Sequence, residues 1–179
     1  MKIHDIDFEP YLSADSIDES IGRLAEKINR DYADAREPIL LLITLSGAMI
    51  FASRLVLQLK VPVELAFVKC SSYGSKRVSS GRIAFQVEPT ASLLGRDVLV
   101  VEDIVDTGNT WVALHTYIEK QGALSIRIAT MLLKKEIYNK PLPIDYTAIE
   151  VSNDFLVGYG LDYNLLGRNI NGIYKARQE

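Results

Sequence analysis

Cysteine and histidine are scarce in this sequence of 179 residues, which has one cysteine, Cys70, and two histidines, His4 and His115. A lone cysteine cannot form an intramolecular disulfide, which suits a reducing compartment. Together these residues are too few for a zinc site, so we assign no transition metal. Runs of about 18 apolar residues are missing, and the N-terminal segment lacks the apolar region of a secretory signal. We expect a soluble cytoplasmic protein that does not engage a membrane.

An excess of positive charge is missing as well. The chain has 20 Lys and Arg against 23 Asp and Glu, a net charge of −3. This balance gives no overall electrostatic reason to bind nucleic acid. A composition of 48% hydrophobic and 24% charged residues is typical of one globular domain that buries a sizeable core.

Helix and strand patterns alternate along the chain. The segment SIDESIGRLAEKI has its apolar residues on one helical face, and Ser16 with Glu19 has the spacing of a capping box. Two strand–helix–strand units follow, with strands at 39–43, 63–68, 98–101 and 126–133, helices at 49–59 and 109–122, and helix stops at Pro62 and Gly122. Strands that are apolar on both faces predict an α/β fold with a mostly parallel sheet flanked by helices.

Two segments depart from this alternation. Residues 71–89 are dense in Ser, Gly and charge, and only RIAFQV alternates like a hairpin arm. Long loops in compact domains are usually functional or disordered. We expect one domain with a core at about 37–137, a mobile loop at about 71–89, and a small hood lobe from about 1–12 and 146–179.

The stretch VLVVEDIVDTGNT places Glu102, Asp103 and Asp106 after an apolar strand. Ligands of open α/β sheets bind at the carboxyl ends of the strands. The small residues that follow can turn their N–H groups toward an anion, helped by the helix dipole, so a phosphate fits there. Helix capping by Asp106 or Thr107 is the alternative, but it leaves Glu102 and Asp103 unexplained.

This stretch resembles the phosphoribosyl-diphosphate (PRPP) motif of the type I phosphoribosyltransferases: a hydrophobic strand, two acids, two apolar residues and Asp-Thr-Gly-x-Thr. LSGA, SSYG, LLKK and DFLVGYGLDYN are similar to segments of the hypoxanthine-guanine phosphoribosyltransferases, in the same order. The resemblance implies the type I fold and a role in purine salvage. The implied reaction is the Mg²⁺-dependent transfer of 5-phosphoribosyl from PRPP to N9 of a 6-oxopurine, giving IMP or GMP and pyrophosphate.

The resemblance also implies roles for the PRPP motif. Glu102 and Asp103 accept hydrogen bonds from the ribose hydroxyls, which Mg²⁺ bridges to pyrophosphate, and their charge stabilises an oxocarbenium-like ribose. Asp106 is the general base that takes the proton from purine N7. The implied site for the 5′-phosphate consists of Asp106, Thr107, Gly108, Asn109 and Thr110.

The residues implied for the purine and for a second metal ion lie on later segments of the sequence. Lys134 donates to the exocyclic O6 of the purine, which selects against adenine. Phe155 stacks on the base, and Leu156 meets its edge through the backbone. Asp162 holds a second Mg²⁺. Without the resemblance, Lys134 reads as a solvated strand end and Phe155 as a core aromatic.

Two loops complete the implied site. Leu45, Ser46 and Gly47 form the pyrophosphate loop, with a non-proline cis peptide, and Arg168 reaches the pyrophosphate. Ser72 and Tyr73 belong to the mobile loop that excludes water from the reaction centre. The sequence departs from the family at Ser46, where many relatives have Lys or Arg, and at Asn169, where Asp is frequent.

Alternatives remain open. The base could be xanthine or, with less support, adenine, because Lys134 and Phe155 favour a 6-oxopurine without ranking hypoxanthine, guanine and xanthine. A regulatory RNA-binding relative of the same fold is another alternative, although the presence of Asp106 and the net charge of −3 argue against it. The resemblance further implies a homodimer or homotetramer.

Overall fold

The computed structural model describes residues 1–72, 83–87 and 91–177. Its main sheet has six strands in the order β5-β4-β3-β6-β7-β8. Their bounds are β3 (Ile39–Leu45), β4 (Val63–Ser72), β5 (Ile83–Val87), β6 (Asp97–Val105), β7 (Ser125–Leu133) and β8 (Tyr146–Glu150). All neighbours pair in parallel except β5, which is antiparallel to β4. The predicted fold class, a mostly parallel sheet in an α/β protein, is confirmed.

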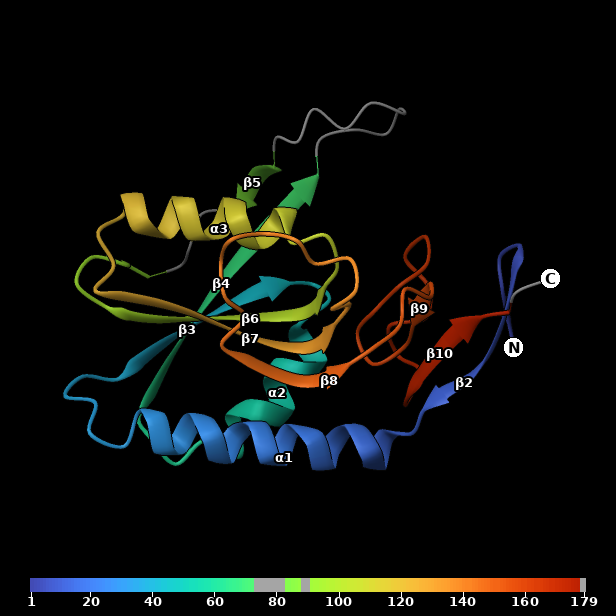
Figure 1. Ribbon diagram of the computed structural model, residues 1–179, viewed down its shortest axis with the longest axis horizontal. Helices are drawn as coiled ribbons and strands as arrows, with labels where there is room; N and C mark the ends of the chain where they lie inside the picture. The colour runs from blue at the N-terminus through green and yellow to red at the C-terminus, as the bar shows by residue number, and fades with distance from the viewer. Residues whose placement is uncertain (73–82, 88–90, 178–179) are drawn as a thin grey trace.

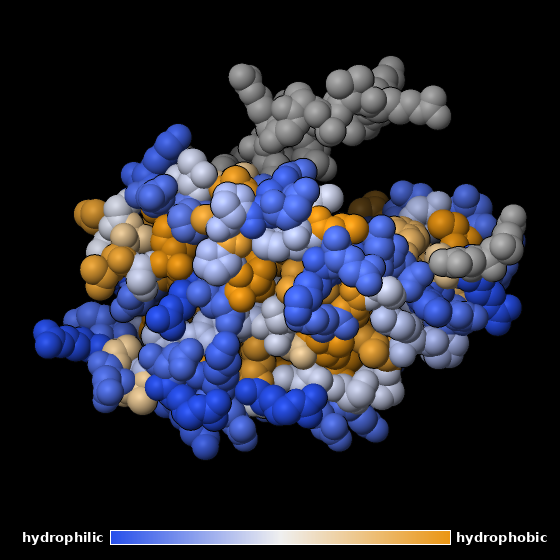
Figure 2. Space-filling view, viewed as in Figure 1, coloured by the Kyte–Doolittle hydropathy of each residue, from blue (hydrophilic) through white to orange (hydrophobic). Residues whose placement is uncertain are grey.

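Helices cover both faces of this sheet (Figure 1). The helices α1 (Ala14–Asp31) and α2 (Met49–Val56) lie on one face, and α3 (Asn109–Lys120) lies on the other. The outer side of α1 forms a largely hydrophilic surface in Figure 2. Among the described residues, no helix combines the length and apolar character required to cross a bilayer.

The position of β3 between two layers of helices explains why the sequence of this strand is continuously apolar. Ile39, Leu41 and Ile43 belong to the core under α1 and α2. Leu40 and Leu42 belong to the core under α3. Successive side chains of a strand point to opposite faces, so a strand between two helical layers needs an apolar residue at every position. Each such side chain contributes roughly 1.5–3 kcal/mol when fully buried.

Two helix boundaries differ from the prediction. The N-cap of α1 is Ser13, whose Oγ accepts a hydrogen bond from the Ser16 N–H at 3.2 Å, so the capping box predicted at Ser16 and Glu19 is wrong. The helix simply begins one turn earlier. The helix α2 ends at Val56 instead of Leu59, well before Pro62, because the chain tightens into turns with i→i−3 hydrogen bonds from Gln58 to Leu55 and from Leu59 to Val56.

A four-stranded antiparallel sheet forms the terminal lobe, in the order β1-β2-β10-β9. Its strands are β1 (Lys2–Ile3), β2 (Ile6–Leu12), β9 (Leu156–Val157) and β10 (Ile173–Ala176). Both ends of the chain lie together in this lobe (Figure 1). The strand β8 pairs with β7 in the main sheet, with Tyr146 opposite Ala129, so the lobe boundary predicted at residue 146 is too early.

Candidate active site

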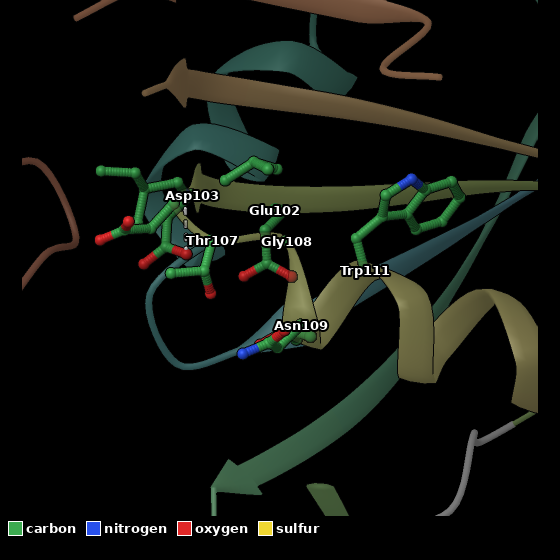
Figure 3. Close-up of a pocket in the computed structure, with 10 residues that line it drawn as sticks. Glu102, Asp103, Thr107, Gly108, Asn109 and Trp111 are labelled. Carbon is green, nitrogen blue, oxygen red and sulfur yellow. Dashed lines mark hydrogen bonds between the residues drawn. The ribbon is translucent and has the colours of Figure 1, made fainter. Parts of the chain in front are cut away.

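The acidic residues of the PRPP motif lie on the last part of β6. This strand continues through Glu102 and Asp103 to Val105, beyond the predicted end at Val101. It runs between β3 and β7, so the two acids emerge at the carboxyl edge near the middle of the sheet. Residues 102–111 line one continuous pocket there (Figure 3), with the indole of Trp111 turned away from the carboxylates. A single contiguous stretch of sequence therefore builds this part of the site.

Glu102 and Asp103 form a pair of neighbouring, buried acids. Burial, and then the neighbouring charge of Asp103, raise the pKa of Glu102 well above its usual value. Burial also raises the pKa of Asp103. Within the described residues, the Oε2 atom of Glu102 is buried without a hydrogen-bond partner. Because an orphaned carboxylate oxygen is costly, the site is suited to a ligand that brings hydroxyl donors or a cation.

The loop after β3 packs directly against this acid pair. The peptide bond between Leu45 and Ser46 is cis, as the family resemblance implied. A Cβ atom at Gly47 would overlap the carboxylate of Asp103, so only glycine fits this approach. Ser46 is exposed at the surface of the same loop. The loop predicted for pyrophosphate and the acids predicted for ribose are thus immediate neighbours.

The turn before α3 is open at its N–H groups. The N-cap of α3 is Gly108, in the left-handed conformation with φ of 80°, and no side chain caps the helix. The capping alternative for Asp106 or Thr107 is therefore wrong. The first hydrogen bond of the helix runs from the Val112 N–H to the Gly108 carbonyl at 3.0 Å, and the first N–H groups of any helix have no intrahelical partner. Such a helix start, with its positive dipole end, can bind an anion.

Lys134 directly follows β7 and is only 8% exposed. Its Nζ lies 3.1 Å from Oδ2 of Asp106 and 3.5 Å from Oδ1 of Asn153. Lys134 is therefore not a solvated strand end. The sequence gives no local signal for Asn153, because nothing in its pattern distinguishes it from any polar residue after a strand.

Phe155, the aromatic residue predicted to stack on the purine, is partly exposed at the surface of the lobe. The side chain of Phe155 is 42% exposed, and its ring meets that of Tyr163 edge-on at 5.3 Å between centroids. A core role for Phe155 is thus excluded. The next residue, Leu156, is buried in β9. A half-exposed ring held by aromatic neighbours offers a face on which a planar ligand can stack.

Asp162 and Arg168, predicted for different ligands, form an ion pair of 2.5 Å between Oδ1 and Nη2. The Nη1 of Arg168 also donates to the Gly160 carbonyl at 2.6 Å, and Oδ2 of Asp162 accepts from the Leu165 N–H at 2.8 Å. Both oxygens of Asp162 thus already have protein partners. Asn169 is exposed beside this pair.

The residues present suit a Mg²⁺ ion that is held jointly with substrate. No group of three or more metal-ligating side chains occurs in the part of the chain that the structure describes. Mg²⁺ is usually bound by one or two carboxylates together with water and substrate phosphates. The buried, unpartnered oxygen of Glu102 beside Asp103 fits this pattern, whereas the paired Asp162 offers less. Tyr73 and the side chain of Ser72 lie outside the described residues, although the backbone of Ser72 ends β4.

The chain matches the model of the phosphoribosyl transferase domain over residues 12–164. It belongs to the phosphoribosyltransferase family. Curated relatives include the hypoxanthine-guanine phosphoribosyltransferases of Streptococcus pneumoniae, 38% identical over 94% of this chain and 92% of the relative, and of Mycobacterium bovis, 36% identical over 90% and 82%. The resemblance to this branch of the phosphoribosyltransferases is confirmed.

Solved structures agree with this assignment. The hypoxanthine phosphoribosyltransferase of Trypanosoma cruzi in complex with the product IMP has a TM-score of 0.87 and 29% identity, covering 99% of this chain and 97% of that one. Another structure of the enzyme from this organism has a TM-score of 0.89 and 30% identity, covering 99% and 95%. The likeness spans both the main sheet and the terminal lobe of this phosphoribosyltransferase.

Proposed function

We propose that this phosphoribosyltransferase acts in purine salvage by transferring the 5-phosphoribosyl group of PRPP to N9 of hypoxanthine or guanine. Pyrophosphate leaves, and IMP or GMP forms. The observation that carries the proposal is the arrangement along residues 102–111, where two buried acids adjoin a helix start with open N–H groups. A ribose and its 5′-phosphate need these two kinds of group side by side. The identity to hypoxanthine-guanine enzymes supports the choice of base.

The acids of β6 would bind and stabilise the ribose. In the proposed mechanism, Glu102 and Asp103 accept hydrogen bonds from the 2′ and 3′ hydroxyls. Their negative charge also stabilises the positive charge that grows on the ribose as its bond to pyrophosphate breaks. Bound Mg²⁺ would supply charge neutralisation to the departing pyrophosphate. The amides from Asp106 to Thr110, with the hydroxyls of Thr107 and Thr110, hold the 5′-phosphate in place.

The purine would lie between the end of β7 and the lobe. Phe155 stacks on its face, the backbone of Leu156 meets its edge, and the ammonium of Lys134 donates to O6. As N9 forms its bond to C1 of the ribose, Asp106 takes the proton from N7. Adenine has an amino donor at position 6 in place of an acceptor, so Lys134 selects against it.

The remaining predicted site residues would bind the departing pyrophosphate or cover the reaction centre. Leu45, Ser46 and Gly47 turn their backbone toward the pyrophosphate, and Arg168 would reach its oxygens after exchanging its contact with Asp162. Asp162 would then be free to contribute to a second Mg²⁺. Ser72 and Tyr73 would close over the reaction centre and exclude water from it.

We propose further that the chain forms a homodimer or homotetramer. Large apolar side chains on α2 and β4 support this proposal, since Met49 is 55% and Leu65 is 41% exposed. Light scattering coupled to gel filtration measures the mass directly. A monomer at micromolar concentration would contradict the proposal.

Steady-state kinetics with PRPP, Mg²⁺ and four bases in parallel test the function. We expect turnover with hypoxanthine and guanine, little with adenine, and none after a chelator removes Mg²⁺. If xanthine is the preferred base, the assignment to hypoxanthine and guanine is wrong. If no base is turned over but the chain binds RNA, the regulatory alternative is correct.

A further inference from the structure

The ammonium of Lys134 has one more hydrogen-bond donor than the surrounding protein uses. A lysine ammonium has three N–H donors. Two acceptors surround it within the described part of the chain, namely Asp106 at 3.1 Å and Asn153 at 3.5 Å. The side chain is almost fully buried, so bulk water does not freely supply a third partner. This leaves one N–H available for a ligand oxygen.

The two acceptors come from different parts of the fold. Asp106 directly follows β6, and Asn153 lies on the short segment between β8 and Phe155. The start of that segment is fixed to the main sheet, because the Val151 N–H donates to the Leu133 carbonyl at 2.9 Å. Asn153 itself is exposed, so its carboxamide reaches the buried ammonium from the open side of the site.

The two acceptors around Lys134 differ in charge. The carboxylate of Asp106 neutralises the charge of the Lys134 ammonium, whereas the carboxamide of Asn153 is uncharged. A hydrogen bond with one ionised group is stronger than a neutral one, and a carboxylate acceptor adds a direct Coulomb attraction to the ammonium that a carboxamide does not. An acid at position 153 would hold the ammonium from two sides, but the carboxamide at 3.5 Å guides it only weakly. The ammonium therefore keeps the freedom to turn toward an incoming oxygen.

We propose that Asn153 is a positioning residue for recognition of the purine: its carboxamide oxygen steers the Lys134 ammonium between Asp106 and the purine O6. Its lack of charge allows the ammonium to leave Asp106 for this oxygen. This inference deepens the proposed function and rests on it. No bond is made or broken in this step, because only hydrogen-bond partners are exchanged.

The substitution Asn153→Asp tests the role of this neutrality. We expect the KM for hypoxanthine to rise about tenfold, because the second carboxylate retains the ammonium, while the KM for PRPP stays the same. Asn153→Ala removes the guide without adding charge, so a smaller rise of about threefold is expected, again for the purine alone. Thermal unfolding of each variant shows whether the fold is retained.

Asp154 provides a matched control one residue away. Its Oδ2 accepts a hydrogen bond from Ser152 Oγ at 2.6 Å, away from Lys134. Asp154→Asn should leave both KM values unchanged. The double variant with Asn153→Asp and Asp154→Asn restores the net charge, so it should keep the high KM for purine if the local contact with Lys134 matters. Recovery in the double variant would show a general charge effect and overturn the inference.

Lys134→Ala separates this inference from the proposed function. In the same assay it should raise the KM for hypoxanthine and leave the KM for PRPP intact. If it does so while both Asn153 variants match the unmodified chain, the positioning role is wrong and the proposed function stands. Equal rises in both KM values for the Asn153 variants would indicate general distortion and would also overturn it. No turnover by the unmodified chain with any base would overturn the proposed function and, with it, this inference.

Discussion

The carboxyl edge of the main sheet and the terminal lobe contribute to the candidate site in different ways. At the sheet edge, consecutive residues from Glu102 to Thr110 supply acids and open amides, because one strand runs into one helix. The lobe contributes isolated residues, such as Phe155, and holds them by contacts between distant parts of the chain. In the proposed function, this difference corresponds to a sheet edge that carries the chemistry and a lobe that orients the base.

The largest effect is expected at the sheet edge, for Asp106→Ala. Loss of the proposed base should lower kcat by about 10²- to 10⁴-fold, since general base catalysis typically contributes this much. The KM for PRPP should change little, because the amides of the turn remain. Single-turnover kinetics with hypoxanthine measure the chemical step directly. A kcat near that of the unmodified chain would show that Asp106 is not the base.

The second expectation concerns Gly47, where the loop after β3 touches the side chain of Asp103 on β6. Gly47→Ala introduces a methyl group into the carboxylate of Asp103, so this side chain or the loop must move. We expect the free energy of unfolding to fall by about 1–3 kcal/mol and the KM for PRPP to rise. Gly22→Ala on α1 is the control, because its methyl group would meet only the flexible end of Gln58, at 3.2 Å. Equal behaviour of the two variants would refute the close approach at Gly47.

A third expectation concerns the cost of burying Glu102. Burial and Asp103 raise its pKa, so in the pH range between the ordinary and the raised value the folded chain binds more protons than the unfolded chain. The stability contributed by this group is therefore present at low pH and is lost as pH rises through that range. The substitution Glu102→Gln removes this loss of stability, because the amide does not titrate.

At neutral pH the Tm of Glu102→Gln should accordingly be higher by about 2–4 °C, and the difference should vanish near pH 4. Binding of PRPP should weaken, because the amide no longer provides a charged acceptor. Scanning calorimetry across the pH range measures the first effect. Glu119→Gln on the exposed side of α3 is the control and should show neither effect. A lower Tm for Glu102→Gln at neutral pH would mean that the acid is stabilised by contacts other than those described.

The same division between sheet edge and lobe explains how far the sequence could predict the molecule. The PRPP motif is contiguous, so local pattern sufficed to place Glu102 and Gly108 at the carboxyl edge of the sheet. The pairing of β8 with β7 brings Tyr146 opposite Ala129, which no local signal indicates. The contact of Asn153 with Lys134 likewise depends on how two distant segments meet. Non-local pairing is set by packing of the whole chain, and short sequence patterns contain little of that information.

The smallest effect is expected where the lobe segment meets the helices, at Tyr159. This residue is 2% exposed, and its hydroxyl donates to Asp18 on α1, which also faces Arg54 on α2 at 4.0 Å. Tyr159→Phe should lower the free energy of unfolding by about 1 kcal/mol, the usual net value of a hydrogen bond, while kcat and both KM values remain unchanged. Tyr163→Phe is the control, because its hydroxyl donates to the exposed Asp5, at 2.6 Å, and the loss of this exposed hydrogen bond should cost less. If Tyr159→Phe instead raised the KM for PRPP at unchanged stability, the lobe would be coupled to the sheet edge, and the division of labour between the two regions would be wrong.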